Sequence, residues 1–298
     1  MSEPIPYVRD LDFTYGKVAQ VSPLIRRVIA HNPSVFTFHG TGTYIVGRGN
    51  VAIIDAGPDL ADHVDAVLAA VRGETVTHLV VTHTHIDHSP ATRHIKAATG
   101  APSYGFGPHA GGEGPAVEEG ADRDFVPDHR VNDSAAIEGC GWTLEAVHTP
   151  GHTSNHLCFR LAEEQALFSG DHVMGWSTTV VSPPDGDMGA YMSSLEKLKA
   201  RDEATYWPTH GPPIPKPQHF VGKLLGHRRQ REAEILSAVA GGAATIPEIV
   251  ALRYRGLDPR LRPAAARTVL AHLIHLVETG RVACPGKPDE DARYSAIA

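Results

Sequence analysis

Residues 82–88 read THTHIDH and directly follow the apolar run HLVV at residues 78–81. Imidazoles and a carboxylate bunched at the end of a buried strand predict a metal site, because both groups are zinc ligands. Residues at i and i+2 of an extended segment point the same way, so His83 and His85 can hold one metal. Asp87 and His88 follow the turn and can face a second, neighbouring metal.

Further candidate ligands stand in glycine-flanked turns later in the chain. They are His152 in PGHT, Asp171 in FSGD and His210 in PTHG. Glycine lets the backbone approach a tight site that a larger residue would obstruct. The chain therefore supplies enough ligands for a pair of cations.

The composition is that of a globular protein. The chain has 298 residues, of which 42% are hydrophobic and 20% are charged, enough for a catalytic domain with a small appendage. No run approaches about 18 apolar residues, and residues 1–30 lack a signal-peptide pattern, so we expect neither a membrane span nor export. The three cysteines have no CxxC spacing, which favours a reducing cytoplasm over a disulfide framework.

Runs of β-branched residues predict strands, and apolar residues at helical spacing predict helices. The predicted strands cover residues 43–46, 51–54, 78–81, 142–147, 156–161 and 166–169, and the predicted helices cover residues 60–71 and 185–200. Because they alternate without a strict βαβ rhythm, we expect a mixed α/β layered sandwich. Residues 104–120 predict a flexible surface loop, with an active-site flap as the alternative, and the prolines of residues 212–217 predict a stiff connector.

The pattern and the charge change in the last part of the chain. Residues 219–298 hold 12 Lys or Arg against 8 Asp or Glu, a net charge of +4, whereas the remainder carries −11. Helices are predicted at residues 221–240 and 264–279, and a T-x-x-E capping box at residues 245–248 starts another between them. With a short hairpin over residues 281–286, this pattern is typical of a winged helix.

The order of these motifs across residues 50–211 resembles the metallo-β-lactamase superfamily. Over nearly the whole chain the resemblance is to the lactamase-like protein 2 type, although Gly42 stands where many relatives have Asn. It implies an α/β fold, a four-layer αββα metallo-β-lactamase sandwich over residues 1–218 followed by a small winged-helix domain over residues 219–298. It implies His83, His85 and His152 on the first metal, Asp87, His88 and His210 on the second, and Asp171 bridging them.

The resemblance also orders the residues around the metals. Asp55 matches a family Asp that supports the site without binding metal. The segment HTPGHT at residues 148–153 offers two histidines; the family ligand matches His152, so His148 is expected in the second layer or in the pocket. Trp176 and Thr178 follow the bridging Asp closely and are expected to line the pocket. His156 and His172 remain open as supporting residues.

The implied chemistry is metal-dependent hydrolysis by a dinuclear-zinc enzyme. Two Zn²⁺ ions per chain would share a bridging hydroxide at neutral pH, with Asp87 as the catalytic residue that orients it; iron and manganese remain open. We expect a small ester, thioester or lactone as substrate. The alternative is a single-strand-selective endoribonuclease, with the basic winged helix assisting RNA binding, although the acidic body counts against it.

Other functions are less well supported by the sequence. A periplasmic β-lactamase would carry a signal peptide. A metal-sensing regulator that reads DNA bases is not expected, because the helix at residues 264–279 has few side chains able to reach base edges. Flavin-linked di-iron relatives usually replace the second His of the H-x-H-x-D-H motif, which is intact here as His85, so this chemistry is not expected. Mononuclear-iron persulfide oxygenation stays open. By resemblance we expect a cytoplasmic homodimer that does not bind membranes.

Overall fold

The computed structural model describes residues 4–110 and 120–297, and it contains two large β-sheets. The first sheet comprises β1 (Ala19–Gln20), β2 (Ile25–Ile29), β3 (Gly42–Arg48), β4 (Asn50–Ile54), β5 (Thr75–Val80), β6 (Ser103–Gly105) and β7 (His129–Arg130). The second comprises β8 (Ala136–Glu138), β9 (Thr143–His148), β10 (Leu157–Leu161), β11 (Ala166–Gly170), β12 (Thr205–Pro208) and β13 (Ile214–Pro215). Every strand predicted from the sequence is present.

The two sheets pack face to face over an apolar core. Tyr44 and Val46 of the first sheet lie in one buried cluster with Phe159 and Phe168 of the second, and the rings of Tyr44 and Phe168 are 5.0 Å apart. Alternate residues of the same strands point the other way, as the pleat requires. Both sheets therefore have apolar outer faces that need covering.

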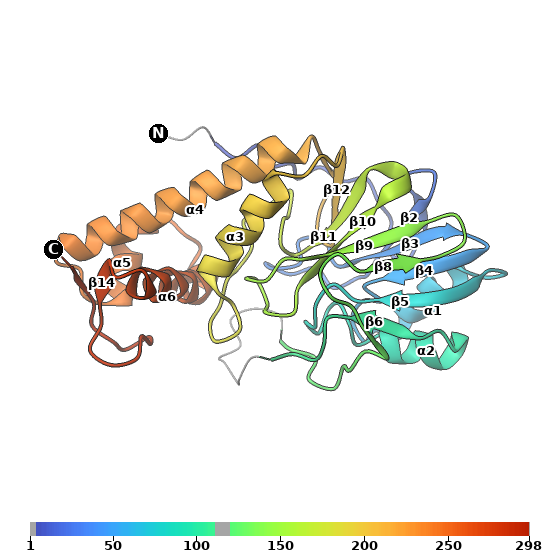
Figure 1. The fold of residues 1–298 in the computed structure, drawn as a ribbon, viewed down its shortest axis with the longest axis horizontal. Coiled ribbons are helices and arrows are strands. Elements are labelled where there is room, and N and C mark those ends of the chain that lie inside the picture. Colours follow the sequence, from blue (N-terminus) through green and yellow to red (C-terminus); the bar gives the residue numbers. More distant parts are fainter. Residues whose placement is uncertain (1–3, 111–119, 298) are drawn as a thin grey trace.

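Helices cover these two outer faces. The helices α1 (Ala61–Ala70) and α2 (Thr92–Thr99) lie on the first sheet, where Val67 and Ile95 join the cluster that contains Ile53. The helices α3 (Met188–Lys199) and α4 (Pro217–Ala240) lie on the second sheet (Figure 1). The predicted four-layer αββα sandwich is confirmed.

The C-terminal part is a small helical unit with a wing. It contains α5 (Ile246–Arg253), a short 3-10 turn (Pro259–Leu261), α6 (Arg262–Glu278), β14 (Val282–Ala283) and β15 (Ser295–Ala296). The predicted capping box at Thr245 and Glu248 is present at the start of α5. The predicted hairpin over residues 281–286 is wrong, because β14 pairs with β15 across a longer loop.

Helix α4 joins the two parts rather than dividing them (Figure 1). Its first half, including Leu224, packs in the core beneath the second sheet, and its second half, including Ile235, packs in the winged-helix core. The proline-rich connector is partly structured. Ile214–Pro215 is an edge strand, and Pro217 begins α4. Proline suits this position because its fixed φ matches the first turn of a helix. The boundary at residues 218 and 219 stays a prediction.

Three further predictions concern membrane spanning, the surface loop, and the assembly and location of the protein. No helix in the described ranges is long and apolar enough to cross a membrane. The predicted surface loop covers residues 104–120. Its first two residues belong to β6, and residues 111–119 lie outside the described residues. The homodimer and the cytoplasmic location stay predictions.

Candidate metal centre

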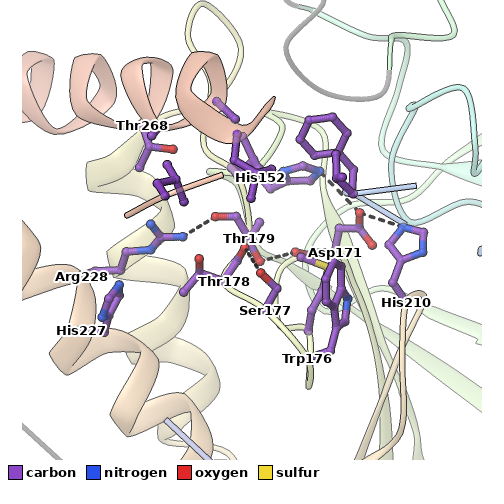
Figure 2. Close-up of a pocket in the computed structure, with 18 of the residues that line it drawn as sticks. His152, Asp171, Trp176, Ser177, Thr178, Thr179, His210, His227, Arg228 and Thr268 are labelled. Carbon is purple, nitrogen blue, oxygen red and sulfur yellow. Dashed lines mark hydrogen bonds and ion pairs between the residues drawn. The ribbon is translucent and has the colours of Figure 1, made fainter. Parts of the chain in front are cut away.

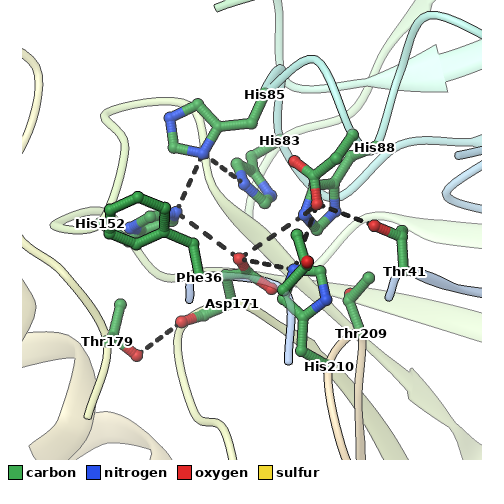
Figure 3. Close-up of polar contacts among 12 residues, drawn as sticks. Phe36, Thr41, His83, His85, His88, His152, Asp171, Thr179, Thr209 and His210 are labelled. Atoms are coloured by element: carbon green, nitrogen blue, oxygen red, sulfur yellow. Dashed lines mark hydrogen bonds and ion pairs between the residues drawn. The ribbon is translucent and has the colours of Figure 1, made fainter. Parts of the chain in front are cut away.

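Residues from four separate loops meet at one end of the two sheets (Figure 3). The heptapeptide 82–88 follows β5, His152 follows β9, Asp171 follows β11 and His210 follows β12. All seven predicted ligands are buried and fall into three groups whose donor atoms lie within 4.8 Å of one another. The groups are His83, His85 and His152; His83, His88 and Asp171; and Asp87, His88 and His210.

The first group presents three imidazole nitrogens to a common point. Nδ1 of His85 lies 3.1 Å from Nε2 of His83 and 3.2 Å from Nε2 of His152 (Figure 3). Burial is the main cause that lowers the pKa of all three rings, so they are neutral and keep lone pairs. Three neutral imidazoles that face one another are a ready set of ligands for one cation.

The remaining predicted ligands combine the histidines His88 and His210 with the carboxylates of Asp87 and Asp171. Asp87 Oδ2 lies 3.3 Å from Nε2 of His88 and 3.2 Å from Nε2 of His210. Asp171 Oδ2 lies 3.5 Å from Nε2 of His88, 3.3 Å from Nε2 of His210 and 3.9 Å from Nε2 of His152. Asp171 therefore stands between the three-histidine group and the pair of His88 and His210, where a bridging ligand is expected.

Hydrogen bonds behind the rings fix which nitrogen faces the site. Nδ1 of His152 bonds to the Val180 carbonyl at 2.8 Å, and Nδ1 of His210 bonds to the Gly40 carbonyl at 3.2 Å. Because a carbonyl only accepts, each Nδ1 carries the proton and each Nε2 is left as the inward atom. Such contacts orient metal ligands in proteins.

The buried carboxylates of Asp87 and Asp171 depend on positive charge nearby. Burial alone would raise the pKa of Asp87, but His88 and His210 outweigh it and hold that pKa far below its ordinary value. Burial likewise lowers the pKa of His210, but the carboxylates of Asp171 and Asp87 outweigh it and raise the pKa to about 10. The two buried carboxylates are thus stabilised largely by nearby cationic groups.

Divalent metal ions fit this donor set. Within the described part of the chain, Oδ1 of Asp87, Nε2 of His88 and Oδ1 of Asp171 are buried without a hydrogen-bond partner. Buried polar atoms are rarely left unpaired, so these inward-facing atoms fit the ligand set of a cation. Imidazole nitrogens mixed with carboxylate oxygens suit borderline-soft cations.

Glycines allow the ligand loops to pass this closely. Gly151 precedes His152 with φ +136°, and a Cβ there would overlap the backbone of Tyr191. Gly170 precedes Asp171 with φ +51°, and a Cβ there would overlap the His156 ring. The loops can therefore reach the site only with glycine at these two positions.

The metal centre opens into a cavity of about 310 Å³ (Figure 2). His85, His152, Asp171 and His210 line its inner end, and the predicted pocket residues include two that line its wall. These two are Trp176 and Thr178. The structure does not bring His148 to this cavity; its ring stacks on Phe106 at 4.2 Å and bonds to the Ser154 carbonyl.

Two further contacts support the predicted ligands: one is made by Thr41, which the sequence did not single out, and one by His156, which it left open as a supporting residue. The hydroxyl of Thr41 donates a hydrogen bond to Asp87 Oδ2 at 2.9 Å. Nε2 of His156 accepts the backbone N–H of Asp171 at 3.2 Å, while its Nδ1 faces Thr149 Oγ1 at 2.9 Å. Thr41 belongs to the glycine-rich HGTGT segment, whose pattern was the available signal.

Family models match both parts of the chain. The model described as Metallo-beta-lactamase superfamily matches residues 37–210, more than half of the chain. The chain belongs to the metallo-β-lactamase superfamily. A second model, Beta-lactamase associated winged helix domain, matches residues 245–289. The protein is therefore a metal-dependent hydrolase whose metallo-β-lactamase domain is followed by a winged helix.

The sequences of named relatives align with most of this chain. An atrochrysone carboxyl ACP thioesterase of Paecilomyces divaricatus is 33% identical over 283 residues, 89% of this chain and 83% of that protein. A Beta-lactamase-like protein 2 homolog of Caenorhabditis elegans is 35% identical over 231 residues, 74% of this chain and 73% of that protein. Both similarities extend beyond the metal ligands.

Solved structures show the same fold. A Beta-lactamase domain protein from Burkholderia ambifaria has a TM-score of 0.80 at 20% identity and covers 97% of this chain and 96% of its own. A metallo-beta-lactamase family protein from Thermus thermophilus has a TM-score of 0.73 at 22% identity and covers 93% and 100%. Because the match covers nearly the whole chain, the fold includes the winged-helix part.

Proposed function

We propose that the protein is a dinuclear-zinc hydrolase of small acyl substrates, with thioesters first and esters or lactones next. The observation that carries the proposal is the placement of the ligand cluster at the inner end of a cavity of about 310 Å³. A cavity of this size matches small-molecule sites in general. The reacting bond would lie at that inner end, with the rest of the substrate along the walls.

The ligand geometry supports two Zn²⁺ ions per chain. His83, His85 and His152 would hold the first ion, Asp87, His88 and His210 would hold the second, and Asp171 would contact both. When bound, the ions would supply Lewis acidity and lower the pKa of a water molecule toward about 7.

Asp87 would orient the nucleophile. The Thr41 hydroxyl holds Oδ2 of Asp87 at 2.9 Å, whereas Oδ1 has no partner among the described residues. With one oxygen fixed, the other can accept a hydrogen bond from the attacking water and turn its lone pair toward the acyl carbon. The water oxygen then bonds to the acyl carbon, the C–S or C–O bond breaks, and the leaving group takes the proton.

The relatives favour a thioester over other acyl substrates. Two further proteins named atrochrysone carboxyl ACP thioesterase, from Cryptosporiopsis sp. and Aspergillus terreus, are each 30% identical to this chain and cover 89% and 83% of it. The cavity is also lined by apolar side chains that suit an acyl group, including Phe36, Met174 and Leu261.

The position of the winged helix supports a small substrate over nucleic acid. Helix α6 is buried along most of its length, and it packs against α3 and α4 of the same chain. Nε of Arg267, in α6, lies 3.3 Å from Oγ of Ser182 in a loop before α3. A helix held in this way does not offer a free face to a nucleic-acid groove.

A substrate panel tests the proposal. Zinc-loaded protein is incubated with acyl thioesters, esters and lactones, and with end-labelled single-stranded RNA. We expect thioester hydrolysis, two zinc ions per chain by elemental analysis, and a fall in kcat of about 10²–10⁴ in Asp87→Asn with an unchanged melting temperature. The matched control is Asp59→Asn, which neutralises an exposed carboxylate paired with Arg93.

The outcomes separate the two classes of substrate. RNA cleavage that is lost in Asp87→Asn, without turnover of any acyl substrate, would replace the acyl proposal with a phosphodiesterase. Near wild-type turnover in Asp87→Asn would contradict the role of this residue.

A further inference from the structure

The wall of the cavity facing away from the metal ligands is built by the winged-helix part and its connecting helix. His227, Arg228 and Arg231 of α4 line it, together with residues of the segment from Tyr254 to Thr268 (Figure 2). We propose that this wall is an anion-binding subsite, centred on Arg228, which selects acyl thioesters that carry a carboxylate or a phosphate. The inference rests on the proposed function and names the substrate class of that site.

Arg228 is a buried cation whose hydrogen-bonding capacity is largely unused. The residue is only 3% exposed, yet within the described residues it forms no ion pair and its Nε has no partner. Its guanidinium donates one hydrogen bond, to the Thr179 carbonyl, and lies 5.2 Å from the Tyr191 ring centroid. Buried charges are normally paired, because desolvation of a lone ion is costly.

The charges around Arg228 favour an anion. Arg9 and Arg231 also line the cavity, and among its described lining residues Asp171, at the metal centre, is the only carboxylate. Arg231 contacts Glu234, which stands outside the lining, at 2.9 Å. Burial and the neighbouring Arg228 and Arg231 lower the pKa of His227 to about 4. The positive field at this wall is therefore not cancelled within the cavity.

The first turn of α6 adds to this field. The helix begins at Arg262 without a side-chain cap, and Ala264 and Ala265 of its first turn line the cavity. The N-terminal end of a 17-residue helix carries partial positive charge from the helix dipole, although the N–H of Arg262 already bonds to the Pro259 carbonyl and Pro263 has none. The guanidinium and the helix start thus favour a negative group in the same cavity.

The remaining lining explains why the anion would belong to a larger acyl substrate. Val35, Phe36 and Met174 stand among the lining residues with Leu257 and Leu261. A substrate with an apolar body and one charged end matches this mixture of surfaces. Figure 2 shows Ser177, Thr178 and Thr179 between the metal ligands and Arg228, so the charged end and the reacting bond would lie apart.

The negative group could belong to either half of a thioester. A carboxylate would stand on the acyl part, whereas a phosphate would stand on the thiol part. Matched substrates distinguish these sources: hexanoyl and adipoyl N-acetylcysteamine, which differ by a terminal carboxylate on the acyl part, and hexanoyl pantetheine and hexanoyl phosphopantetheine, which differ by a phosphate on the thiol part. Thiol release measures kcat/KM for each.

Substitutions in α4 identify the subsite. Arg228→Met removes the buried cation, Arg228→Lys keeps the charge with a different shape, and Arg231→Gln removes the neighbouring cation. The control is Arg229→Gln, which removes an equal charge from the next residue, where the side chain is 63% exposed and pairs with Glu196. Melting temperatures show whether each variant is folded, and calorimetric titration with adipate and hexanoate measures binding without turnover.

We expect wild-type kcat/KM to be at least about tenfold higher for one anionic thioester than for its neutral match, the factor lost with a charge-assisted hydrogen bond. Arg228→Met should remove this preference, with a larger loss on the anionic substrate than on its neutral match, Arg228→Lys should keep part of the preference, and Arg229→Gln should keep all of it. Arg231→Gln should reduce it, which tests the subsite if Arg228→Met does not fold. Preference for the adipoyl substrate assigns the site to the acyl half, and preference for the phosphopantetheine thioester assigns it to the thiol half.

Other results would overturn the inference. Equal turnover of neutral and anionic thioesters by the wild type, or an equal loss on all substrates in every folded Arg228 variant, would mean that the wall does not select charge. If no thioester is hydrolysed, the proposed function fails instead. The adipate titration then decides the anion subsite by itself, since equal affinity in the wild type and in the folded Arg228 and Arg231 variants would exclude it.

Discussion

Oδ2 of Asp55 lies 2.9 Å from Nδ1 of His88, and this contact fixes the orientation of a central metal ligand. Oδ1 of the same carboxylate accepts the backbone N–H of Thr82 at 2.8 Å, and Oδ2 also accepts the Thr82 hydroxyl. Asp55 adopts φ +50°, a conformation that Asn and Asp tolerate best after glycine. One carboxylate thus holds both the start of the ligand loop and a ligand ring.

Asp55→Asn should weaken metal binding while the fold persists. Asn tolerates the same backbone conformation but replaces one accepting oxygen with an amide donor, so either Thr82 or His88 loses its acceptor. We expect the zinc dissociation constant to rise about 10- to 100-fold, the usual effect of removing a group that supports a ligand. Competition with a chromogenic chelator measures it, and Asp59→Asn is the control. An unchanged constant would show that Asp55 does not support His88.

Thr41→Val should lower kcat rather than raise KM. Valine keeps the shape of threonine but cannot donate to Asp87 Oδ2, and it also leaves Nδ2 of Asn32 without the acceptor that it has at 3.0 Å. We expect kcat to fall about tenfold or more, since a hydrogen bond to a charged group is lost. Thr41→Ser keeps the hydroxyl and should restore most of the rate. A rise in KM at constant kcat would argue that Thr41 acts on substrate binding instead.

The structure agrees with the sequence-based predictions where the pattern depends on local chemistry. The clustering of side chains from residues 82–88 was predictable because neither packing nor solvation requires imidazoles to be bunched directly after an apolar strand. Short edge elements such as β13 and β15 have no local signal, since their pairing depends on distant partners. The hairpin over residues 281–286 was wrong for this reason.

The surroundings of the site were less predictable than its ligands. The contact of Thr41 with Asp87 joins residues 46 positions apart, and the glycine-rich pattern around Thr41 does not identify its partner. The positive charge of residues 219–298 was visible, but the place of Arg228 in the cavity depends on the angle of α4. His148 and His152 share one motif, and only the backbone path after Gly151 separates a ring beside Phe106 from a ligand.

Gly151→Ala should unfold the His152 loop. A Cβ at this position overlaps the backbone of Tyr191 in α3, and φ +136° is unfavourable for any other residue. We expect a loss of unfolding free energy of at least about 1–3 kcal/mol together with lower zinc content. Gly73→Ala is the control, because Gly73 also has a positive φ (+84°) but no atom lies within 4 Å of the position that an alanine methyl group would take. Similar losses in both variants would assign the effect to backbone strain alone.

His63 should make stability depend on pH independently of the metal site. Its side chain is 3% exposed and its Nε2 lies 2.8 Å from Oγ1 of Thr43. Burial lowers its pKa from 6.5 to about 4. The neutral ring is favoured in the folded state, so its contribution is complete above pH 6.5 and is lost as the pH falls toward 4.

The variant His63→Gln isolates this contribution, because glutamine is polar but does not titrate. Between pH 7.5 and pH 5.0 the advantage of the wild type over the variant should shrink by roughly 2 kcal/mol, since each unit between the two pKa values is worth about 1.4 kcal/mol. Urea unfolding of both proteins in chelator measures this difference, and the other histidines cancel because the two chains share them. A difference that stays constant over this range would mean that His63 titrates alike in the folded and unfolded chains.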